Sequence, residues 1–308
     1  MTIEALQKRI KTTNELRNIV GTMKSLSTAS ILQYDEASKA LKKYNETIIH
    51  GLQSAVKNGI WNKPYSSKTP IEKQKIIAII IGSDNGLVGK FNRDIISCAE
   101  KYFKEIGADK NNVSYVGIGK RIIGILERNK CEIDEKYAVS NSVKNISLIA
   151  NSVVIRLDEI MAKRKAERVV IFYNEKPSRS APFKNSYKTL LPIDEEFYQN
   201  LRKQPWNSRG FPLITIEDNI FVSNLIKEHI MMSLVGGITD SLKAEHHTRL
   251  NNMQAAEKNI DENLEKMNLE YQQMRQEAIT SELLDVVSGS EALRNRLKKE
   301  KEARNKKK

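Results

Sequence analysis

Hydrophobic and small residues recur through residues 1–60 in alternating steps of four and three. This spacing is the heptad pattern that forms the seam of a coiled coil. Near the start of the chain the pattern continues back to Ile3 with one shortened step, which a coiled coil accommodates by local overwinding. The seam positions are Leu16, Val20, Met23, Ser27, Ser30, Tyr34, Ala37, Leu41, Tyr44 and Ile48.

The same spacing returns in the last part of the chain, with one extra step of four. All seven prolines lie between Pro64 and Pro212, so both ends of the chain lack the strongest helix breaker. Two long helices are therefore predicted, and each can bury the seam of the other. The second seam consists of Met253, Ala256, Ile260, Leu264, Met267, Tyr271, Met274 and Ala278.

The two predicted helices differ in length. A helix over 216–297 would be about 120 Å long, against roughly 80 Å for the helix at the start of the chain. The last third of the longer helix would then extend beyond its partner, with no cover from this chain. The alternative is an ordinary bundle, in which Gly236-Gly237 or Asn251-Asn252 breaks the second helix.

The middle of the chain has the pattern of an α/β domain. A β-branched run at 75–82 is followed by a glycine-rich turn and a helical pattern over 87–106, and a second strand with its glycine lies at 112–119. A third unit combines a helix at 142–165 with a strand at 167–175. Alternating strands and helices predict a small domain with a largely parallel sheet.

After this domain the chain has no regular pattern over 176–212, apart from a possible edge strand at 187–193. The fold class expected is α/β, with a small Rossmann-like domain inserted between two coiled-coil helices. Its parts are an N-terminal helix at 1–60, an α/β domain at 61–212, a C-terminal helix at 213–297 and a basic tail at 298–308.

The net charge of +13 changes this picture little, because more than half of it lies at one end of the chain. Between Arg294 and Lys308 there are nine Lys or Arg and two Glu, so this stretch carries +7 and the rest of the chain +6. A basic tail is usually a solvated, mobile end, and we rank that interpretation above a nucleic-acid-binding arm. No nucleic-acid partner is expected.

Targeting and membrane signals are absent from the sequence. The start, MTIEALQKRI, has no apolar signal-peptide core, and the longest apolar runs are far too short to span a bilayer. Cys98 and Cys131 are far apart and form no C-x-x-C, which favours reduced thiols in a cytosolic compartment. Any membrane association is therefore expected to come through a partner, without direct insertion.

One loop invites comparison with phosphate-binding motifs. GSDNGLVGK follows the first predicted strand, but Asp84 stands where the first glycine would be, and Phe91 replaces the Ser or Thr that binds magnesium. A tight turn capped by Ser83 or Asp84 is the better interpretation. The four histidines lack metal-ligand spacing, and no pattern indicates a nucleophile. We expect no catalytic residue, no metal and no cofactor.

Three stretches of the sequence resemble one family. Residues 9–30, RIKTTNELRNIVGTMKSLSTAS, resemble the N-terminal helix of the γ subunit of F-type ATP synthases, and GSDNGLVGKFN is similar to the central loop of that family. Arg249 and Met253 fit the pattern upstream of the family's closing helix. That helix is the closest match, through Arg275, Gln276, Ala278, Ile279, Thr280, Glu282, Leu283, Val287, Gly289, Ala292 and Leu293.

The resemblance extends from about Ile3 to Leu293, and it includes departures. These mark a divergent member of the family. The stretch after Leu293 is longer and more basic than the family pattern requires. The departures are Ser30 for the usual Lys, Asn85 for Arg, Lys90 for Gly, Glu277 for Ala and Ser281 for Gln.

The resemblance implies a rotor rather than an enzyme. In this family the terminal helices form an antiparallel coiled coil, the central stalk, whose C-terminal end stands inside a ring of alternating α and β subunits. The α/β domain and lower coil sit on the membrane ring of c subunits together with ε. One copy per complex couples ion-driven rotation of the c ring to ATP synthesis or hydrolysis, as a peripheral protein on the cytoplasmic face of the cell membrane.

The same resemblance implies the partner contacts. Arg249, Gln276 and Thr280 would make polar contacts with loops of the β subunits, and Met23 with Lys24 would face the same collar. Two other functions are weighed beside this one. A nucleotide-binding enzyme would need the Asp84 loop to accept phosphate, and a nucleic-acid-binding coiled coil would depend on the basic tail.

Overall fold

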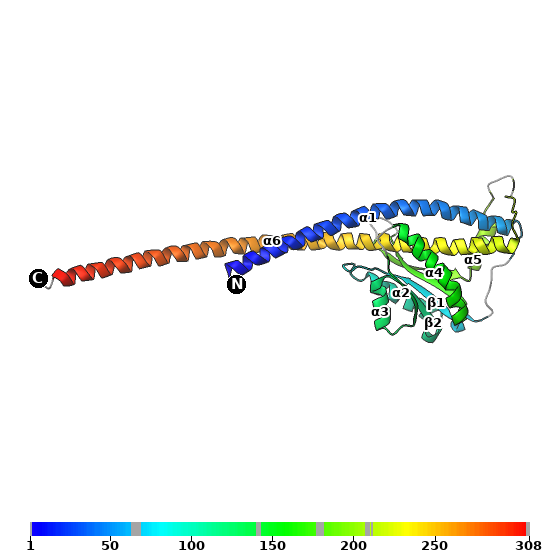
Figure 1. Cartoon of the computed structure of the whole chain (residues 1–308), viewed down its shortest axis with the longest axis horizontal. Helices are drawn as coiled ribbons and strands as arrows, with labels where there is room; N and C mark the ends of the chain where they lie inside the picture. The colour runs from blue at the N-terminus through cyan, green and yellow to red at the C-terminus, as the bar shows by residue number, and fades with distance from the viewer. Residues whose placement is uncertain are drawn as a thin grey trace. The chain divides into compact units, whose positions relative to one another are not determined.

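The structure is a computed structural model (Figure 1). The chain divides into two compact units, one formed by Met1–Met23 with Met253–Lys308 and the other by Lys24–Asn252. Side chains are described for all residues below except 143 and 295–305. The residues that the structure describes are 2–62, 69–139, 143–176, 182–206, 210 and 212–305.

Long helices occupy both ends of the chain, as the seams predicted. Helix α1 spans Ile3–Lys57 and helix α6 spans Asp218–Asn305. Helix α6 passes without interruption through Gly236-Gly237 and Asn251-Asn252, so the alternative of a broken second helix is wrong. It also continues beyond 297 into the basic segment. The predicted fold class, long terminal helices with an inserted α/β domain, is confirmed.

In the first unit, the start of α1 packs against α6 with the two helices running in opposite directions. Leu6 is fully buried there, in one cluster with Leu264 and Met267. Farther along α1, the Arg17 guanidinium lies 2.6 Å from the Asp261 carboxylate. Higher residue numbers on α1 therefore meet lower numbers on α6, which is the antiparallel order.

Three of the predicted seam positions, Leu16, Tyr44 and Ala278, are wrong, because each is exposed. Ala278 lies on the part of α6 that no described residue of its unit covers. Leu16 is 49% exposed, and the face of α1 that reaches α6 there passes through its neighbour Arg17. A straight helix has about 3.6 residues per turn, so a strict heptad drifts off the contact line. Tyr44 is 47% exposed because its hydroxyl reaches out to donate a hydrogen bond to the Glu228 carboxylate, at 2.9 Å.

A five-stranded sheet with the order β3-β2-β1-β4-β5 forms the centre of the second unit. The first four strands are parallel, and β5 pairs antiparallel with β4. The order reverses between β1 and β4, as in Rossmann-like sheets. The strands are β1 Ile76–Ile81, β2 Val113–Ile118, β3 Ile133–Tyr137, β4 Arg168–Glu175 and β5 Lys184–Leu191.

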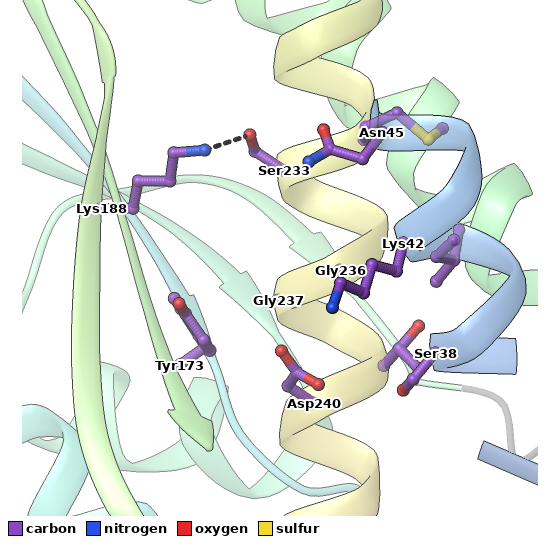
Figure 2. A pocket seen from close by; sticks show the side chains of 12 residues that line it. Ser38, Lys42, Asn45, Tyr173, Lys188, Ser233, Gly236, Gly237 and Asp240 are labelled. Carbon is purple, nitrogen blue, oxygen red and sulfur yellow. Dashed lines mark hydrogen bonds between the residues drawn. The ribbon is translucent and has the colours of Figure 1, made fainter. Parts of the chain in front are cut away.

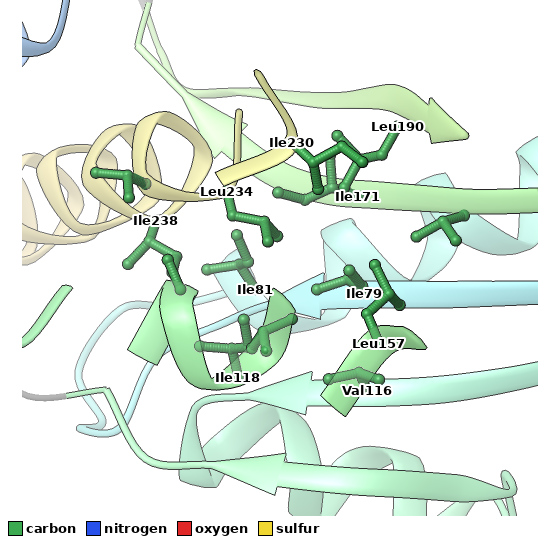
Figure 3. Packing of buried hydrophobic residues seen from close by; sticks show 14 of the residues in the cluster. Ile79, Ile81, Val116, Ile118, Leu157, Ile171, Leu190, Ile230, Leu234 and Ile238 are labelled. Atoms are coloured by element: carbon green, nitrogen blue, oxygen red, sulfur yellow. The ribbon is translucent and has the colours of Figure 1, made fainter. Parts of the chain in front are cut away.

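Helices cover both faces of this sheet. On one face, α2 (Phe91–Glu105) and α3 (Lys120–Arg128) pack against alternate residues of β1, including Ile80. On the other face, α4 (Val143–Arg164) and α6 enclose the remaining residues, as Figure 3 shows for Ile79 and Ile81 beside Leu234 and Ile238. Every residue of β1 is buried, because a central parallel strand has helices on both sides.

Two elements were not predicted from the sequence. Strand β3 has the sequence IDEKY, in which three charged residues replace the alternation of apolar and polar residues typical of a strand. Two of these charged residues, Asp134 and Glu135, form ion pairs with arginines of α4. Helix α5 spans Glu195–Lys203, inside the stretch expected to be irregular. Its N-cap Asp194 accepts a hydrogen bond from the amide of Glu196, a capping signal that the sequence does contain. The expected edge strand is present as β5.

Helix α6 packs closely against the sheet at Gly237, the second of two adjacent glycines. A Cβ on Gly237 would lie 2.8 Å from Ile171 Cδ1 and 3.5 Å from both Ile81 Cδ1 and a ring carbon of Tyr173. A Cβ on the adjacent Gly236 would meet nothing within 4 Å. Close packing therefore explains why residue 237 is a glycine, but it does not explain the glycine at position 236.

None of the described helices is both long enough and apolar enough to cross a membrane.

The glycine pair supports a paired stability test. Gly236→Ala should raise the free energy of unfolding by up to about 1 kcal/mol, because Ala is the better helix former and has room there. Gly237→Ala should lower it by about 1–3 kcal/mol through overpacking against Ile171. Urea unfolding of the purified chain measures both. Equal effects of the two substitutions would contradict this account of how α6 meets the sheet.

Candidate functional site

The end of α6 presents a long surface that no other described part of its unit covers. Every residue from 275 to 294 is exposed, although the same helix is buried at Leu264 and Met267. We call residues 275–294 the α6 tip. Its exposed large apolar residues are Ile279, Leu283, Leu284, Val286, Val287 and Leu293.

The α6 tip has two different faces. At about 100° per residue, most of its apolar and polar side chains separate onto opposite sides of the helix. An amphipathic helix normally buries its apolar face, so this face is a candidate contact surface. The apolar face carries Ile279, Leu283, Val286 and Leu293, and the polar face carries Glu277, Ser281, Asp285 and Ser288.

The apolar face of the tip is not a continuation of the coiled-coil seam. Its centre is rotated by about 100° around the helix axis from the seam that packs against α1. A longer coiled coil would have kept the same direction. The tip is therefore built for a partner that approaches from another side than α1. The seam residues used for this comparison are Leu264, Met267, Tyr271 and Met274.

Two of the predicted contact residues lie together on the tip. Gln276 and Thr280 are one helical turn apart and exposed, at the flank of the apolar face. The Thr280 hydroxyl donates a hydrogen bond to the backbone carbonyl of Gln276, at 2.8 Å. This bond leaves the Thr280 methyl group and the whole Gln276 amide facing outward, where a partner could reach them.

Met23 and Lys24 are neighbours in α1, and each is half-buried. Met23 is the last α1 residue of the first unit, and Lys24 is the first residue of the second unit. Their contacts with a collar of another subunit stay predictions.

Arg249, the remaining predicted contact residue, lies within the packing of its own chain. It is only 5% exposed, and one guanidinium nitrogen donates to the Glu245 carboxylate one turn earlier. Another lies 3.3 Å from His246 Nδ1. The ring of Tyr34 in α1 stacks on His246, with ring centroids 5.6 Å apart. We call these four residues the polar cluster, and in it the guanidinium of Arg249 is engaged inside the chain.

Burial shifts the proton affinities of this polar cluster in opposite directions. It raises the pKa of the Glu245 carboxyl to about 7, against a lowering effect of Arg249. It lowers the pKa of His246 to about 4, helped by the positive charge of Arg249 and by His247. The folded state therefore favours neutral forms of both Glu245 and His246.

Sequence reasoning missed this cluster. Its signals were present: Glu245 precedes Arg249 by four residues, the favourable order for an ion pair within a helix. Tyr34 also stood on the seam, where a phenol is large enough to reach across to the partner helix. Nothing in the spacing showed that the pair faces inward.

The glycine-rich loop after β1 is held by bonds within the chain. The Asp84 carboxylate accepts hydrogen bonds from the backbone amides of Lys120, at 2.8 Å, and Val139, at 3.0 Å. It therefore caps the N-terminus of α3. The Ser83 hydroxyl donates a hydrogen bond within the turn to the backbone carbonyl of Asn85, at 2.9 Å. The N-cap residue of α2 is Lys90, with no side-chain hydrogen bond.

Several of the amides at which this loop could bind phosphate already have partners within the chain. In the first turn of α2, the amides of Phe91 and Arg93 bond to carbonyl groups of the preceding turn. At the N-terminus of α3 the anion is the carboxylate of Asp84 itself. A nucleotide phosphate would have to displace this charge, so the geometry disfavours the nucleotide-binding alternative.

A cavity of about 250 Å³ lies in the second unit, between α1, the sheet and α6 (Figure 2). Lys188 of β5 donates to the Ser233 hydroxyl at 2.9 Å, and Lys42 of α1 also lines the cavity. Asp240 of α6 is on the same wall, and burial raises its pKa to about 6. Because ammonium groups and a carboxylate share this small space, the cavity selects strongly for neither anions nor cations.

Comparison with known proteins places these features in one family. The family model described as ATP synthase matches residues 2–293. The ATP synthase gamma chain of Geotalea uraniireducens is 27% identical over 298 residues, covering 95% of this chain and 99% of that protein. The gamma chain of Helicobacter pylori strain G27 is 27% identical over 311 residues, covering 94% and 98%.

Solved structures agree on the fold. The rotor of the Euglena gracilis mitochondrial ATP synthase contains a chain that superposes with a TM-score of 0.63 at 16% identity, covering 90% of this chain and 99% of that one. The central stalk and c-ring structure from Tetrahymena thermophila gives a TM-score of 0.56 at 15% identity, covering 77% and 99%.

The chain is thus a long-helix stalk protein with an inserted α/β domain, and it belongs to the ATP synthase family. Within that family it is similar to the gamma chains over nearly its whole length. The resemblance drawn from the sequence is confirmed. The gamma chain is a non-catalytic subunit.

The Asp84 cap can be tested by two substitutions. Asp84→Ala removes the acceptor of two backbone amides and should lower the free energy of unfolding by about 2 kcal/mol. Asp84→Asn keeps a carbonyl oxygen at the same place and should cost less. Urea unfolding of the purified chain gives both values. If Ala and Asn cost the same, the acceptor geometry is not what holds this loop.

The neighbours Glu245 and His246 should give pH effects of opposite sign. The raised pKa of Glu245 contributes stability below about pH 4.5 that is lost as the pH rises through about 7. The lowered pKa of His246 contributes stability above about pH 6.5 that is lost as the pH falls through about 4. Each effect reaches at most about 1.4 kcal/mol per pH unit.

Glu245→Gln and His246→Gln therefore separate the two effects. Between about pH 5 and pH 7, the variant altered at Glu245 should gain stability relative to the unchanged chain as the pH rises. The variant altered at His246 should lose stability relative to that chain over the same range. Unfolding curves at several pH values measure both slopes, and slopes of the same sign would refute the assignment of buried neutral groups.

Proposed function

We propose that this chain is the central-stalk rotor of an F-type ATP synthase. It would couple rotation of the membrane c ring to ATP synthesis or hydrolysis at the sites of the α/β ring. The observation that carries the proposal is the α6 tip, a helix end with an apolar face on one side and a polar face on the other. Its partners would be the α and β subunits, the ε subunit and the c ring, with one copy of this chain per complex.

A two-faced shaft can treat identical subunits differently. Around the ring the catalytic subunits have the same sequence, so differences between their states must come from what each one touches. A subunit facing Ile279 and Leu283 meets an apolar surface, whereas one facing Glu277 and Asp285 meets carboxylates. Differential contact energy of this kind shifts each subunit toward a different conformation. Rotation would then pass these states around the ring.

Transmission of torque requires that α1 and α6 do not slip past each other. In the second unit, contacts at several positions along the two helices oppose slipping. Lys243 of α6 lies 2.5 Å from Asp35 of α1, and Tyr34 stacks on His246. Nearer the end of α1, Leu52 is fully buried in a cluster that includes Leu225 of α6. A shaft with this function needs stiffness and surface shape, and no nucleophile.

The proposed contacts with the ring fall into two groups. Gln276 and Thr280 are both exposed on the tip, which supports direct contact with β-subunit loops, although the Thr280 hydroxyl also donates to the Gln276 carbonyl. Met23 and Lys24 are partly accessible and would face the same collar. Arg249 is engaged with Glu245, so we assign it to positioning the polar cluster in place of a direct contact. The chain would lie on the cytoplasmic face of the cell membrane, held there by the c ring.

A pull-down tests this function most directly. The tagged chain is captured from gently solubilised membranes of its host, and the captured proteins are identified and assayed for ATPase activity. The proposal predicts α and β subunits in equal amounts, with several copies of each per tagged chain. Capture of nucleic acid, or of proteins without ATPase subunits, would show that this family sequence serves another purpose.

The tip contacts can be tested in the assembled enzyme. Replacing Gln276 and Thr280 together by Ala should reduce ATP-driven ion pumping severalfold relative to ATP hydrolysis, because polar contacts to the ring are lost. Folding should be unaffected, since both residues are exposed. Gln272→Ala with Gln273→Ala, an exposed pair on α6 before the tip begins, is the matched control and should have a smaller effect. Unchanged coupling in the Gln276/Thr280 variant would remove these residues from the contact set.

A further inference from the structure

Gly236 has no packing role, and it lines the cavity between α1, the sheet and α6 that Figure 2 shows. A Cβ at this position would meet nothing within 4 Å, so a side chain there would extend into unfilled space. Glycine is also a poor residue for the interior of a helix. The simplest account of Gly236 is that it keeps this wall of the cavity open.

Several polar groups of the cavity wall have no partner in the chain. The Ser38 hydroxyl oxygen of α1 is buried, and no described group lies within hydrogen-bond distance of it. Lys42 and Asn45 of α1 and Asp240 of α6 line the same cavity. None of these three side chains forms a hydrogen bond or an ion pair with any residue that the structure describes. All four groups are therefore available to a ligand.

The unpaired charges of this wall have both signs. The cation that most influences Asp240 is Lys243, which already pairs with Asp35 of α1 at 2.5 Å. Glu175 of β4 adds a second negative charge near Asp240. On the α1 side the free charge is the Lys42 ammonium group, and the two helices bring it and the Asp240 carboxylate to one cavity (Figure 2). One side of the cavity thus favours a cation and the other an anion.

We infer that this cavity binds a small zwitterion of the amino-acid type. The ligand's ammonium group bonds to the Asp240 carboxylate, and its carboxylate bonds to Lys42 and Asn45. Its apolar part packs against Leu41 and Met232, which also line the cavity. The volume of about 250 Å³ is below the roughly 300–1,000 Å³ typical of drug-sized ligands, so the ligand is small. This site goes beyond the proposed function and does not depend on it, because one chain forms it alone.

Ligands with charge of only one sign fit this cavity less well. An anion beside Lys42 leaves Asp240 without a partner, and a cation beside Asp240 leaves Lys42 without one. A partly desolvated charge is costly unless it is paired, so a ligand that carries both signs is favoured. A nucleotide phosphate has only negative charge and would be repelled by Asp240.

A ligand held in this way also connects two helices. Lys42 belongs to α1 and Asp240 to α6, so the bound zwitterion adds a contact between them. Because it binds the folded chain, it should stabilise that chain by mass action. Binding should therefore raise the urea concentration at which the chain unfolds.

The test uses the purified full chain and L-valine as the probe. Isobutylamine is L-valine without the carboxylate, and isovalerate is L-valine without the ammonium group, so each keeps the apolar part and one charge. Titration calorimetry measures the three affinities. The ε-methyl NMR signal of Met232 reports binding in the cavity, and that of Met267, which lies in the first unit, is the internal control.

L-valine should bind with a dissociation constant of about 1 mM or below, and each analogue at least about tenfold more weakly. The Met232 signal should shift on saturation and the Met267 signal should not. Three results would overturn the inference: no saturable binding of L-valine, equal affinity for L-valine and either analogue, or binding that leaves the Met232 signal unchanged.

Matched variants locate the two charges and the open wall. Asp240→Asn and Lys42→Gln should each weaken L-valine binding about fivefold or more, whereas Lys43→Gln, at the exposed neighbour of Lys42, should change it less than about twofold. Gly236→Leu should abolish binding in a folded chain, because its Cβ has room and the rest of the side chain occupies the cavity. Gly124→Leu in α3, where a Cβ also meets nothing within 4 Å, is its control. Equal effects of a variant and its control would contradict the site.

Discussion

The rest of the structure depends on one constraint: a single unbroken helix must satisfy different surroundings along its length. Where α6 meets the sheet, Gly237 removes the side chain that would clash with Ile171. Where it meets α1 in the first unit, Leu264 and Met267 bury a narrow seam. Along the tip no part of the described chain covers it, and the apolar face has turned away from the seam direction. Each local sequence is consistent with its own surroundings, and the backbone remains helical throughout.

The polar cluster illustrates what packing between long helices needs besides apolar contacts. Burying Glu245 with Arg249 is a weak source of stability, since desolvation offsets most of the attraction. Buried polar groups have a better-attested role in fixing register between helices. Here the ring of Tyr34 meets His246 only when α1 and α6 are in one alignment. A heptad seam made of similar apolar residues would tolerate displacement by a whole heptad, whereas this contact would not.

Much of the architecture could be predicted from the sequence because it follows from periodicity. The two seams, the three βα units and the edge strand all come from patterns that repeat over a few residues along the chain. The failures have a different cause. Leu16 lies off the contact line because of a small drift in helical phase, and β3 is concealed by charges that form ion pairs with α4. Asp84 bonds to amides at 120 and 139, partners that no local pattern could reveal.

The predicted contact residues also divide into those whose surroundings agree with the sequence prediction and those whose surroundings do not. Gln276 and Thr280 were placed by resemblance alone, and the structure leaves both exposed, as a contact role requires. Arg249 came from the same resemblance, yet its exposure is only 5%. A family pattern records that a residue type is needed at a position, not whether it serves a partner or the chain's own core. Burial distinguishes these cases, because a buried guanidinium engaged with Glu245 and His246 cannot reach a second protein without breaking the polar cluster first.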